Sequence, residues 1–443
     1  MRAPRTCGAR RAAKALVAVL ARATEIVVRA AARDVRMATV VVVVLVVSAP
    51  PHRVHIASSA SMSAVLDGVV VSRDVITQPA SSHSQSPSRV AAAVAMRRWR
   101  AIALVAALSR AAMFIACARA PAAVTAALAR RVELTSAVDA MRRTLEGAHA
   151  RAVFGASAYD GSAFHGHPFV VFAVERIARW VGSEGTTTSG VGVELAAASA
   201  WLAADSVALA LLCALATTVT TDMDGVFRVC ALYALNPINA MALMARSNAA
   251  VGRACVFASA FAASRGYVVA AGVASAMAMQ MQPHIVVMVP ALALMCSRHE
   301  WRRWVTLGGA CAATHCASAV LMGDDFSKWW SSAVLFAVRS EDQTPNLGMH
   351  WYLFTTMFDH FREFYVVALN AAPLALAAPL AYRFSNRPLT GLVLSLIVAT
   401  ICAPYPTLSD VVTYMSLLSV IAVDESGNPL YIRSQRSRRS WLF

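Results

Sequence analysis

The sequence has 443 residues, of which 58% are hydrophobic and only 14% are charged. Its mean hydropathy of +0.56 is too apolar for a soluble globular protein and is typical of a protein that crosses a membrane several times. The formal net charge of +16 comes almost entirely from arginine, since lysine occurs only at Lys14 and Lys328. The basic residues cluster beside apolar segments, as the positive-inside rule requires, so we expect no nucleic-acid partner.

The first 95 residues differ from the rest of the chain. They combine Arg-rich Ala segments, a Val run at 40–47 and a Ser-rich polar stretch. The Val run is too short to span a bilayer, and an organelle transit peptide or a signal-peptide core is one interpretation of this region. Because a basic flank and a hydrophobic segment follow Met96, we instead expect residues 1–95 to be an unassigned N-terminal extension, either poorly ordered or an artefact of the gene model.

From Trp99 onward, apolar stretches suited to membrane helices follow one another, so the sequence predicts an all-α polytopic membrane protein with about 9–12 transmembrane helices. Several are shorter than 18 residues and are expected to be tilted, broken or re-entrant. The stretch "QMQPHI" (280–285) either breaks one long helix or joins two short ones. The expected helices are 99–118, 167–181, 194–217, 226–244, 249–264, 267–282, 284–297, 304–322, 364–382, 388–403 and 411–423.

Charge in the short loops predicts the orientation. The loops at 97–100, 297–303 and 382–388 are basic and should face the cytosol, whereas the loop at 323–349 is acidic. Alternation of the helices then predicts that residues 119–166, 323–349 and 404–410 lie together on the non-cytosolic face.

Four polar segments interrupt the apolar pattern. In "FGASAYDGSAFHGHPF" (154–169), His165 and His167 precede a helix that should start at Pro168, and their i, i+2 spacing does not suit a metal pair. In "LNPINAMALMARSNAAVGR" (235–253), Asn236 and Asn239 either pack helices around a proline kink or contact a ligand.

The third polar segment is "EDQTPNLGMHWYLFTTMFDHF" (341–361). Its rings are spaced for an amphipathic helix, and tryptophan and tyrosine prefer the membrane interface. An aromatic belt explains that pattern, and a platform for an amphiphile with a polar head and lipid tails is the alternative. The rings, continuing beyond the segment, are Trp351, Tyr352, Phe354, Phe358, Phe361, Phe364 and Tyr365.

The fourth polar segment is "APYPTLSDVVTYM" (403–415). Thr407 or Ser409 can cap the next helix, and Asp410 falls in the first turn of that helix, where the helix dipole favours a carboxylate. Capping suffices to explain Asp410.

Motifs for catalysis and cofactors are missing from the sequence. There is no Walker loop, HExxH, GxSxG or dinucleotide fingerprint, and the nine cysteines are scattered without a CxxC pair. One DxD match, Asp222 and Asp224, is a weak signal. We therefore expect no catalytic residues, no cofactor and no metal.

The polar segments in this order, preceded by "RRTLEGAHARAVFGASAYDGSAFHGHPFV" (142–170), resemble the PIG-U subunit family of the glycosylphosphatidylinositol (GPI) transamidase. The resemblance runs from about residue 96 to about residue 420. It implies a multi-pass protein of the endoplasmic reticulum (ER) membrane with an architecture like the GT-C mannosyltransferases but without their activity. The implied partners are a PIG-K-like catalytic subunit, PIG-T, PIG-S, a GPAA-like subunit, the GPI lipid and membrane lipids.

The implied role is to help recognise and position the GPI lipid, the anchor that replaces a C-terminal signal on precursor proteins. A GPI lipid has a glycan, which suits amides and hydroxyls, and acyl chains, which suit rings and aliphatic walls. The candidate GPI- and lipid-binding residues on the matching motifs are Thr344, Pro345, Asn346, Trp351, Tyr352, Phe358, Phe361, His165, Asn236, Asn239, Tyr405 and Asp410.

Two alternatives remain at this stage. A GT-C mannosyltransferase would need an acidic base in the first non-cytosolic loop, for which Glu133, Asp139, Glu146 and Asp160 are candidates without forming a paired motif. A transporter would need buried charges and repeats, and only Arg110 and Asp205 lie mid-helix. Residues 421–443 depart from the family pattern, so we expect an atypical tail from truncation or missplicing.

Overall fold

The computed structural model describes residues 89–427 except 163, 183–189, 221 and 298–299. The described residues are helical and contain no strand, only an isolated antiparallel bridge between Ala140 and Ser247. The predicted all-α polytopic class is therefore confirmed. Residues 1–88 of the expected N-terminal extension and residues 428–443 of the expected tail lie outside the described residues.

Five helical segments are long and apolar enough to cross a membrane, and shorter apolar helices complete the bundle. The longer segments are built from α4 (Arg89–Arg119), α8 (Gly190–Val219), α9 (Met223–Ala234) with α10 (Pro237–Met244), α14 (Trp301–Met322) continued to Arg339, and η5 (Asp359–Phe361) with α18 (Arg362–Arg383). The shorter ones are α11 (Ala249–Ser264), α12 (Val268–Met281), η2 (Pro283–Met288) with α13 (Val289–Cys296), α19 (Pro388–Ile401) and α20 (Leu408–Gly427).

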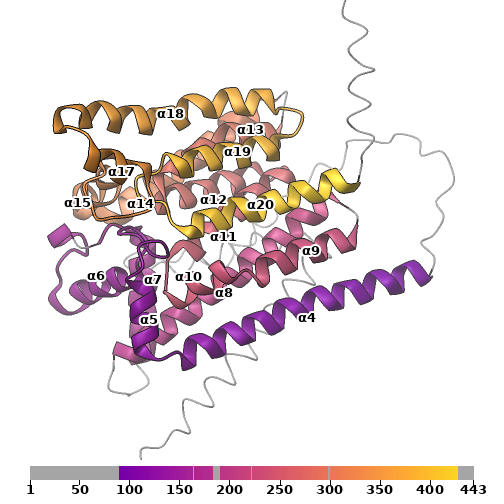
Figure 1. Cartoon of the computed structure of the whole chain (residues 1–443), viewed down its shortest axis with the longest axis horizontal. Coiled ribbons are helices and arrows are strands. Elements are labelled where there is room, and N and C mark those ends of the chain that lie inside the picture. Colours follow the sequence, from indigo (N-terminus) through magenta and orange to yellow (C-terminus); the bar gives the residue numbers. More distant parts are fainter. Residues whose placement is uncertain (1–88, 163, 183–189, 221, 298–299, 428–443) are drawn as a thin grey trace, which may run out of the picture.

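Short helices and loops gather at one end of the bundle, on the left of Figure 1, while the membrane helices run lengthwise across it. This end contains α5 (Ala122–Ala129), α6 (Met141–Phe154), η1 (Asp160–Ser162), α7 (Pro168–Gly182), α15 (Phe326–Trp329), α16 (Phe336–Arg339) and α17 (Met349–Thr356). Between α14 and α16 the chain passes through η3 (Gly323–Asp325) and a π-helical turn, η4 (Trp330–Leu335).

Contacts between distant loops show that the segments at 119–166, 323–349 and 404–410 meet at one end of the bundle. We call it the non-cytosolic end after the prediction from loop charge, and we call the opposite end the cytosolic end. The amide of Leu408 donates to the carbonyl of Glu133 at 2.8 Å, and the amide of Asp342 donates to the hydroxyl of Tyr405 at 2.8 Å. At the opposite end, Arg98 pairs with Asp224 at 2.8 Å. The DxD match therefore lies at the cytosolic end, where Asp222 caps α9 by accepting from the amides of Asp224 and Gly225.

The stretch "QMQPHI" joins two short helices. Helix α12 ends at Met281, Gln282 is extended, and η2 begins at Pro283, whose ring suits the first turn of a helix. Gln282 donates to Asp410 at the non-cytosolic end, whereas Arg303, following α13, donates to the carbonyl of Cys296 at the cytosolic end. Helix α12 therefore runs toward the non-cytosolic end, and η2 with α13 runs back toward the cytosolic end.

Two expectations were wrong. Helix α7, expected to span the membrane, packs on α6 and α8 at the non-cytosolic end (Figure 1), and it is not among the apolar candidate spans. It carries Glu175, which pairs with Arg151 at 3.0 Å. Since α4 crosses in one direction and α8 crosses back, α7 does not add a crossing.

The second correction concerns the aromatic segment. Helix α17 ends at Thr356, Met357 is extended, and η5 and α18 follow. The rings therefore do not form one amphipathic helix. They occupy two helices joined by a sharp break.

Close helix packing depends on a small residue in α12. A Cβ at Gly272 would lie 2.7 Å from Ala310 Cβ and 2.7 Å from the carbonyl oxygen of Leu307 in α14. Small residues permit such close approach of membrane helices. This contact holds α12, and with it Gln282 at its end, against α14.

Candidate functional site

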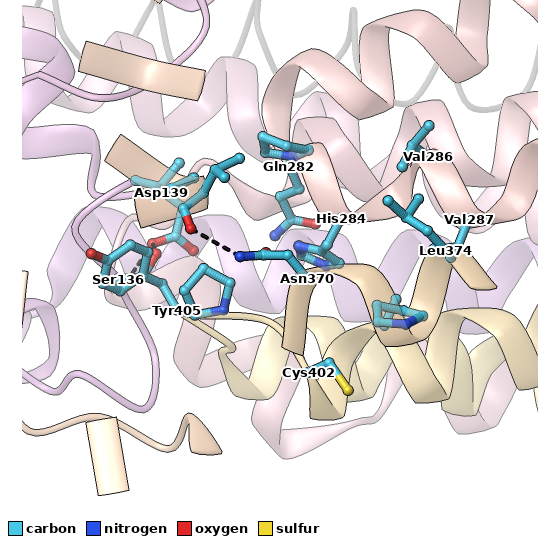
Figure 2. A pocket seen from close by; sticks show the side chains of 17 residues that line it. Ser136, Asp139, Gln282, His284, Val286, Val287, Asn370, Leu374, Cys402 and Tyr405 are labelled. Carbon is cyan, nitrogen blue, oxygen red and sulfur yellow. Dashed lines mark hydrogen bonds between the residues drawn. The ribbon is translucent and has the colours of Figure 1, made fainter. Parts of the chain in front are cut away.

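A cavity of about 250 Å³ opens at the non-cytosolic end of the bundle (Figure 2). It lies between the loop at 136–139, the start of η2, the end of α16, the middle of α18 and the 402–405 turn. Its lining residues are Ser136, Val138, Asp139, Gln282, Pro283, His284, Val286, Val287, Ala337, Val338, Asn370, Pro373, Leu374, Ala399, Cys402, Pro404 and Tyr405. Most of this wall is apolar, and the polar side chains gather at one end.

Asp139 is the buried carboxylate at that polar end. It accepts hydrogen bonds from the amide of Ser136, from the Ser136 hydroxyl at 2.8 Å and from the Ser247 hydroxyl at 2.8 Å. Burial raises the pKa of Asp139 to about 6, against these hydrogen bonds, which lower it, and the charge of Asp410 raises it further. The carboxylate thus fixes the first non-cytosolic loop to the loop that precedes α11.

Asp410 organises the turn on the adjacent side of the cavity. Its Oδ2 accepts from the Thr407 amide at 2.9 Å, which is the capping pattern expected at the start of α20. Its Oδ1 accepts from Gln282 Nε2 at 2.7 Å. The predicted capping role is confirmed, and the same side chain also joins α20 to the α12–η2 junction.

A ring stack connects two of the polar segments, at 154–169 and 403–415, through Phe336 of α16. His165 lies parallel to Phe336, with centroids 3.5 Å apart, and Phe336 stacks on Tyr405 with centroids 5.3 Å apart. His165 Nδ1 also lies 2.6 Å from the carbonyl oxygen of Ser332. Burial lowers the pKa of His165 and raises that of Tyr405. The neutral ring of His165 is therefore favoured, and the stack forms a rigid wall beside the cavity.

His350, which the sequence did not single out, ties the aromatic segment to this wall. One ring nitrogen lies 2.7 Å from the hydroxyl of Ser340, and the other lies 2.9 Å from the carbonyl oxygen of Cys402. Nearby, a Cβ at Gly348 would lie 2.8 Å from the carbonyl oxygen of Pro404. The chain between 340 and 350 is therefore packed closely against the 402–406 turn.

The predicted "TPN" residues build the exposed turn before α17. The amide of Thr344 donates to Asp342 Oδ1 at 2.9 Å, and Asn346 Oδ1 accepts from the amide of Gly348 at 2.6 Å. Pro345 is exposed between them. None of the three predicted residues lines the cavity, and their ligand contact stays a prediction.

The predicted rings face outward. Tyr352, Phe358 and Phe361 are 62%, 74% and 47% exposed, and Trp351 is partly buried. They do not line the cavity either. The platform and the cavity are thus separate surfaces, joined through the ordered turn at 340–350.

The two predicted asparagines lie away from the cavity. Asn236 caps α10 by accepting from the amides of Ile238 and Asn239. Asn239 Nδ2 donates to Asp205 at 3.3 Å inside the bundle. Of the predicted site residues, Tyr405 lines the cavity, while His165 and Asp410 support its wall.

The acids considered for a transferase are not paired with one another. Asp160 pairs with Lys328 at 2.8 Å, and Glu146 pairs with Arg142 at 2.9 Å. Only Asp139 of the four candidates lines the cavity. No group of three or more potential metal ligands occurs in the part of the chain that the structure describes.

Sequence inspection missed Ser136 and Asn370 and considered Asp139 only as a transferase base, although each carried a signal. Ser136 and Asp139 have the S-x-x-D spacing of a capping box. Asn370 is an amide within an apolar helix, a pattern that marks function or helix packing; its Nδ2 donates to the carbonyls of Val338 and Val366.

Comparisons with known proteins identify the family of the chain. The family model of the GPI transamidase subunit PIG-U matches residues 104–429. The chain is 24% identical over 326 residues to the GPI-anchor transamidase component PIGU of Homo sapiens, covering 66% of this chain and 73% of that protein. It is 26% identical over 207 residues to PIGU of Mus musculus, covering 43% and 47%.

A fungal protein is also similar. The GPI transamidase component GAB1 homolog of Schizosaccharomyces pombe is 35% identical over 81 residues, covering 18% of this chain and 20% of that protein. The match to the mouse protein spans about half of that relative's length, whereas the family match extends over most of the membrane domain. The chain therefore belongs to the PIG-U family of GPI transamidase subunits.

Proposed function

We propose that this protein is a non-catalytic, multi-pass subunit of a GPI transamidase complex in the ER membrane, where it helps recognise and position the GPI lipid. The catalytic step belongs to a PIG-K-like partner, and PIG-T, PIG-S and GPAA-like subunits complete the complex. Family membership supports the assignment to the complex. The geometry of the non-cytosolic end supports the lipid-positioning role.

The observation that carries the proposal is the cavity, because one part of its wall is apolar and another part is polar. Pro373, Leu374 and Ala399 contribute aliphatic surface, whereas Asp139 and Gln282 contribute polar groups (Figure 2). Ligand sites combine a mainly apolar wall with a few placed polar groups. An amphiphile with a hydroxyl-rich head and hydrocarbon chains matches both parts.

Charge restricts which part of a GPI lipid the cavity accepts. Among its lining residues there is no lysine or arginine, and Asp139 contributes a carboxylate. A phosphate group would meet repulsion there and would not gain the ion pair that phosphate sites use. The cavity therefore takes an alkyl chain or uncharged glycan hydroxyls, and the phosphate remains outside it.

The exposed rings provide a second contact. Trp351, Tyr352, Phe358 and Phe361 lie on α17 and the following break, and such rings favour the boundary between headgroups and acyl chains. Thr344, Pro345 and Asn346 form the exposed polar turn just before them. This order presents polar groups and rings to the same lipid.

The test compares two tryptophan substitutions on one helix. Leu374→Trp introduces a large ring into the cavity wall, whereas Leu376→Trp adds the same ring at an exposed position of α18 that does not line the cavity. Tagged protein is purified in mild detergent, and the co-purifying proteins and GPI lipids are measured by mass spectrometry. We expect both variants to retain a PIG-K-like protease and its partners, and only Leu374→Trp to lose GPI lipid several-fold.

Two outcomes would reject the proposal. Equal GPI recovery with both variants would show that the cavity does not bind this lipid. Purification without a PIG-K-like protease, together with mannose transfer from dolichyl-phosphate mannose to a GPI precursor, would instead identify a mannosyltransferase. Asp139 would then be the first residue to examine as its base.

A further inference from the structure

Polar side chains from five helices meet inside the bundle, away from the cavity described above. Asp205 on α8 accepts from Arg110 Nη1 at 2.5 Å, from the Tyr233 hydroxyl at 2.6 Å and from Asn239 Nδ2 at 3.3 Å. Arg253 Nη2 on α11 lies 3.5 Å from the same carboxylate. Both guanidinium groups lie 5.6 Å from the Tyr233 ring centroid. We call these five side chains the intramembrane cluster.

The intramembrane cluster is not electrically balanced by itself. It contains two arginines and one aspartate, and Asp205 and Arg253 are 0% and 2% exposed. Arg253 Nε and Nη1 have no hydrogen-bond partner among the described residues. A buried charge in a membrane protein is costly unless it is paired and its donors are satisfied. One positive charge therefore requires a further partner.

A second, very small cavity adjoins Arg253. Its volume is about 10 Å³, which is the space of about one water molecule. Asp410, Thr413 and Tyr414 of α20 contribute to its wall, as do Gln282 and His284. A site of this size with several polar neighbours meets the conditions for a buried water.

The wall also identifies the chemistry of the occupant. Asp410 repels an anion, and Arg253 repels a cation, so neither ion suits the space between them. A water molecule can accept from the guanidinium and donate to the carboxylate at the same time. Gln282 and His284 line both this small cavity and the larger one, in which Figure 2 shows them, so the two cavities are neighbours.

We propose that a structural water molecule in the small cavity accepts a hydrogen bond from Arg253 and donates one to Asp410. Asp410 then acts as the second counter-ion of the arginine pair, and two arginines are balanced by two aspartates. The bridge links α20 to α11 and so fixes the turn beside the larger cavity. This charge balance does not depend on which ligand the larger cavity takes.

The direct test is a high-resolution electron microscopy map of the full chain purified with its complex. We expect a density peak within about 3.2 Å of both the Arg253 guanidinium and an Asp410 oxygen. An empty cavity would overturn the proposal. Direct contact between Arg253 and Asp410, without a bridging peak, would overturn it as well.

A double-mutant cycle tests the charge balance independently. Arg253→Met and Asp410→Asn should each lower the melting temperature of the purified complex by several degrees, because each leaves an opposite charge uncompensated. The melting temperature of the double variant should fall by clearly less than the sum of the two single decreases. Additive losses would contradict the counter-ion role.

The matched control is the exposed pair Arg142 and Glu146, whose side chains are 82% and 51% exposed. The cycle of Arg142→Met and Glu146→Gln should show almost no coupling, since solvent screens this pair. If the single variants at Arg253 and Asp410 do not fold, recovery of folded protein in the double variant is the supporting result. If none of the three folds, the map of the unmodified protein decides.

Discussion

Asp139 shows how one buried carboxylate can serve structure and site together. Its oxygens hold the loop at 136–139 against Ser247, while the residue also lines the cavity. Its raised pKa of about 6 means that folding shifts this carboxyl toward its protonated form relative to the unfolded chain, although it is still mostly ionised at neutral pH. Ionisation of Asp139 therefore lowers the stability of the folded protein.

This cost predicts the direction of a pH dependence. Because the folded pKa is above the ordinary aspartate value of 3.8, the stability that Asp139 contributes is complete below about pH 4 and is lost as the pH rises through 6. The difference between the two limits is on the order of 3 kcal/mol. Asp139→Asn should flatten the change in melting temperature of the detergent-solubilised complex between pH 4.5 and pH 7.5.

A control at an exposed carboxylate separates this effect from a general response to pH. Asp160 pairs with Lys328, which lowers its pKa, so its contribution to stability has the opposite sign and is lost as the pH falls. Asp160→Asn should leave the downward trend from pH 4.5 to pH 7.5 in place. An unchanged trend in Asp139→Asn would refute the assignment.

At the scale of elements, the short helices of the bundle explain where the cavity forms. Helices α11, α12 and α19 have 16, 14 and 14 residues, which at 1.5 Å per residue is less than the thickness of the hydrocarbon core. These helices end at short turns, such as the turn at Gln282. Other parts of the protein cover these turns. The non-cytosolic cavity lies where α12 and α19 end.

Close packing of α12 on α14 yields a prediction at this scale. Gly272→Val forces atoms into space held by Ala310 and the backbone of Leu307, and overpacking of this kind costs about 1–3 kcal/mol. We expect a lower melting temperature and less folded protein after size-exclusion chromatography in detergent.

The matched control is Gly308→Val on α14. A Cβ at Gly308 meets nothing within 4 Å among the described residues, so the same substitution meets no steric conflict there. The packing argument fails if the two variants are destabilised equally.

At the scale of the whole molecule, the intramembrane cluster holds five helices together through one carboxylate. Asp205→Asn keeps the shape of the side chain but removes the charge that faces Arg110 and Arg253. Breaking a buried pair in this way typically costs 3–5 kcal/mol. We expect the variant to lose most of its folded, complex-bound form in a co-purification assay.

Asp324→Asn is the control, because Asp324 is exposed in the turn after α14. Its substitution should leave the recovery of partner subunits near that of the unmodified chain. Normal recovery with Asp205→Asn would mean that the cluster is dispensable for folding.

The sequence alone determined the class of the protein and most of its helices. The predicted helix at 249–264 matches α11 at both ends, and the predicted span at 226–244, with its proposed kink at Pro237, corresponds to α9 and α10. These predictions succeeded because hydrophobic length, proline and flanking charge act locally along the chain. The polar segments also led to the family, which the comparison confirmed.

Local patterns failed where distant contacts decide the structure. The segment at 167–181 is apolar enough to suggest a membrane helix, but α7 packs on α6 and α8 at the non-cytosolic end. The spacing of the aromatic rings fits one helix, yet Met357 is extended and ends α17. Neither result follows from periodicity.

Only the tertiary structure decided which polar residues share a site. Tyr405 lines the cavity and His165 supports its wall, whereas Asn239 belongs to the intramembrane cluster. Asp139 and Gln282 come together from positions far apart in the chain. Sequence predicts most of the membrane segments because apolar length is a local property of the chain, but the packing of helices against one another determines which polar groups meet.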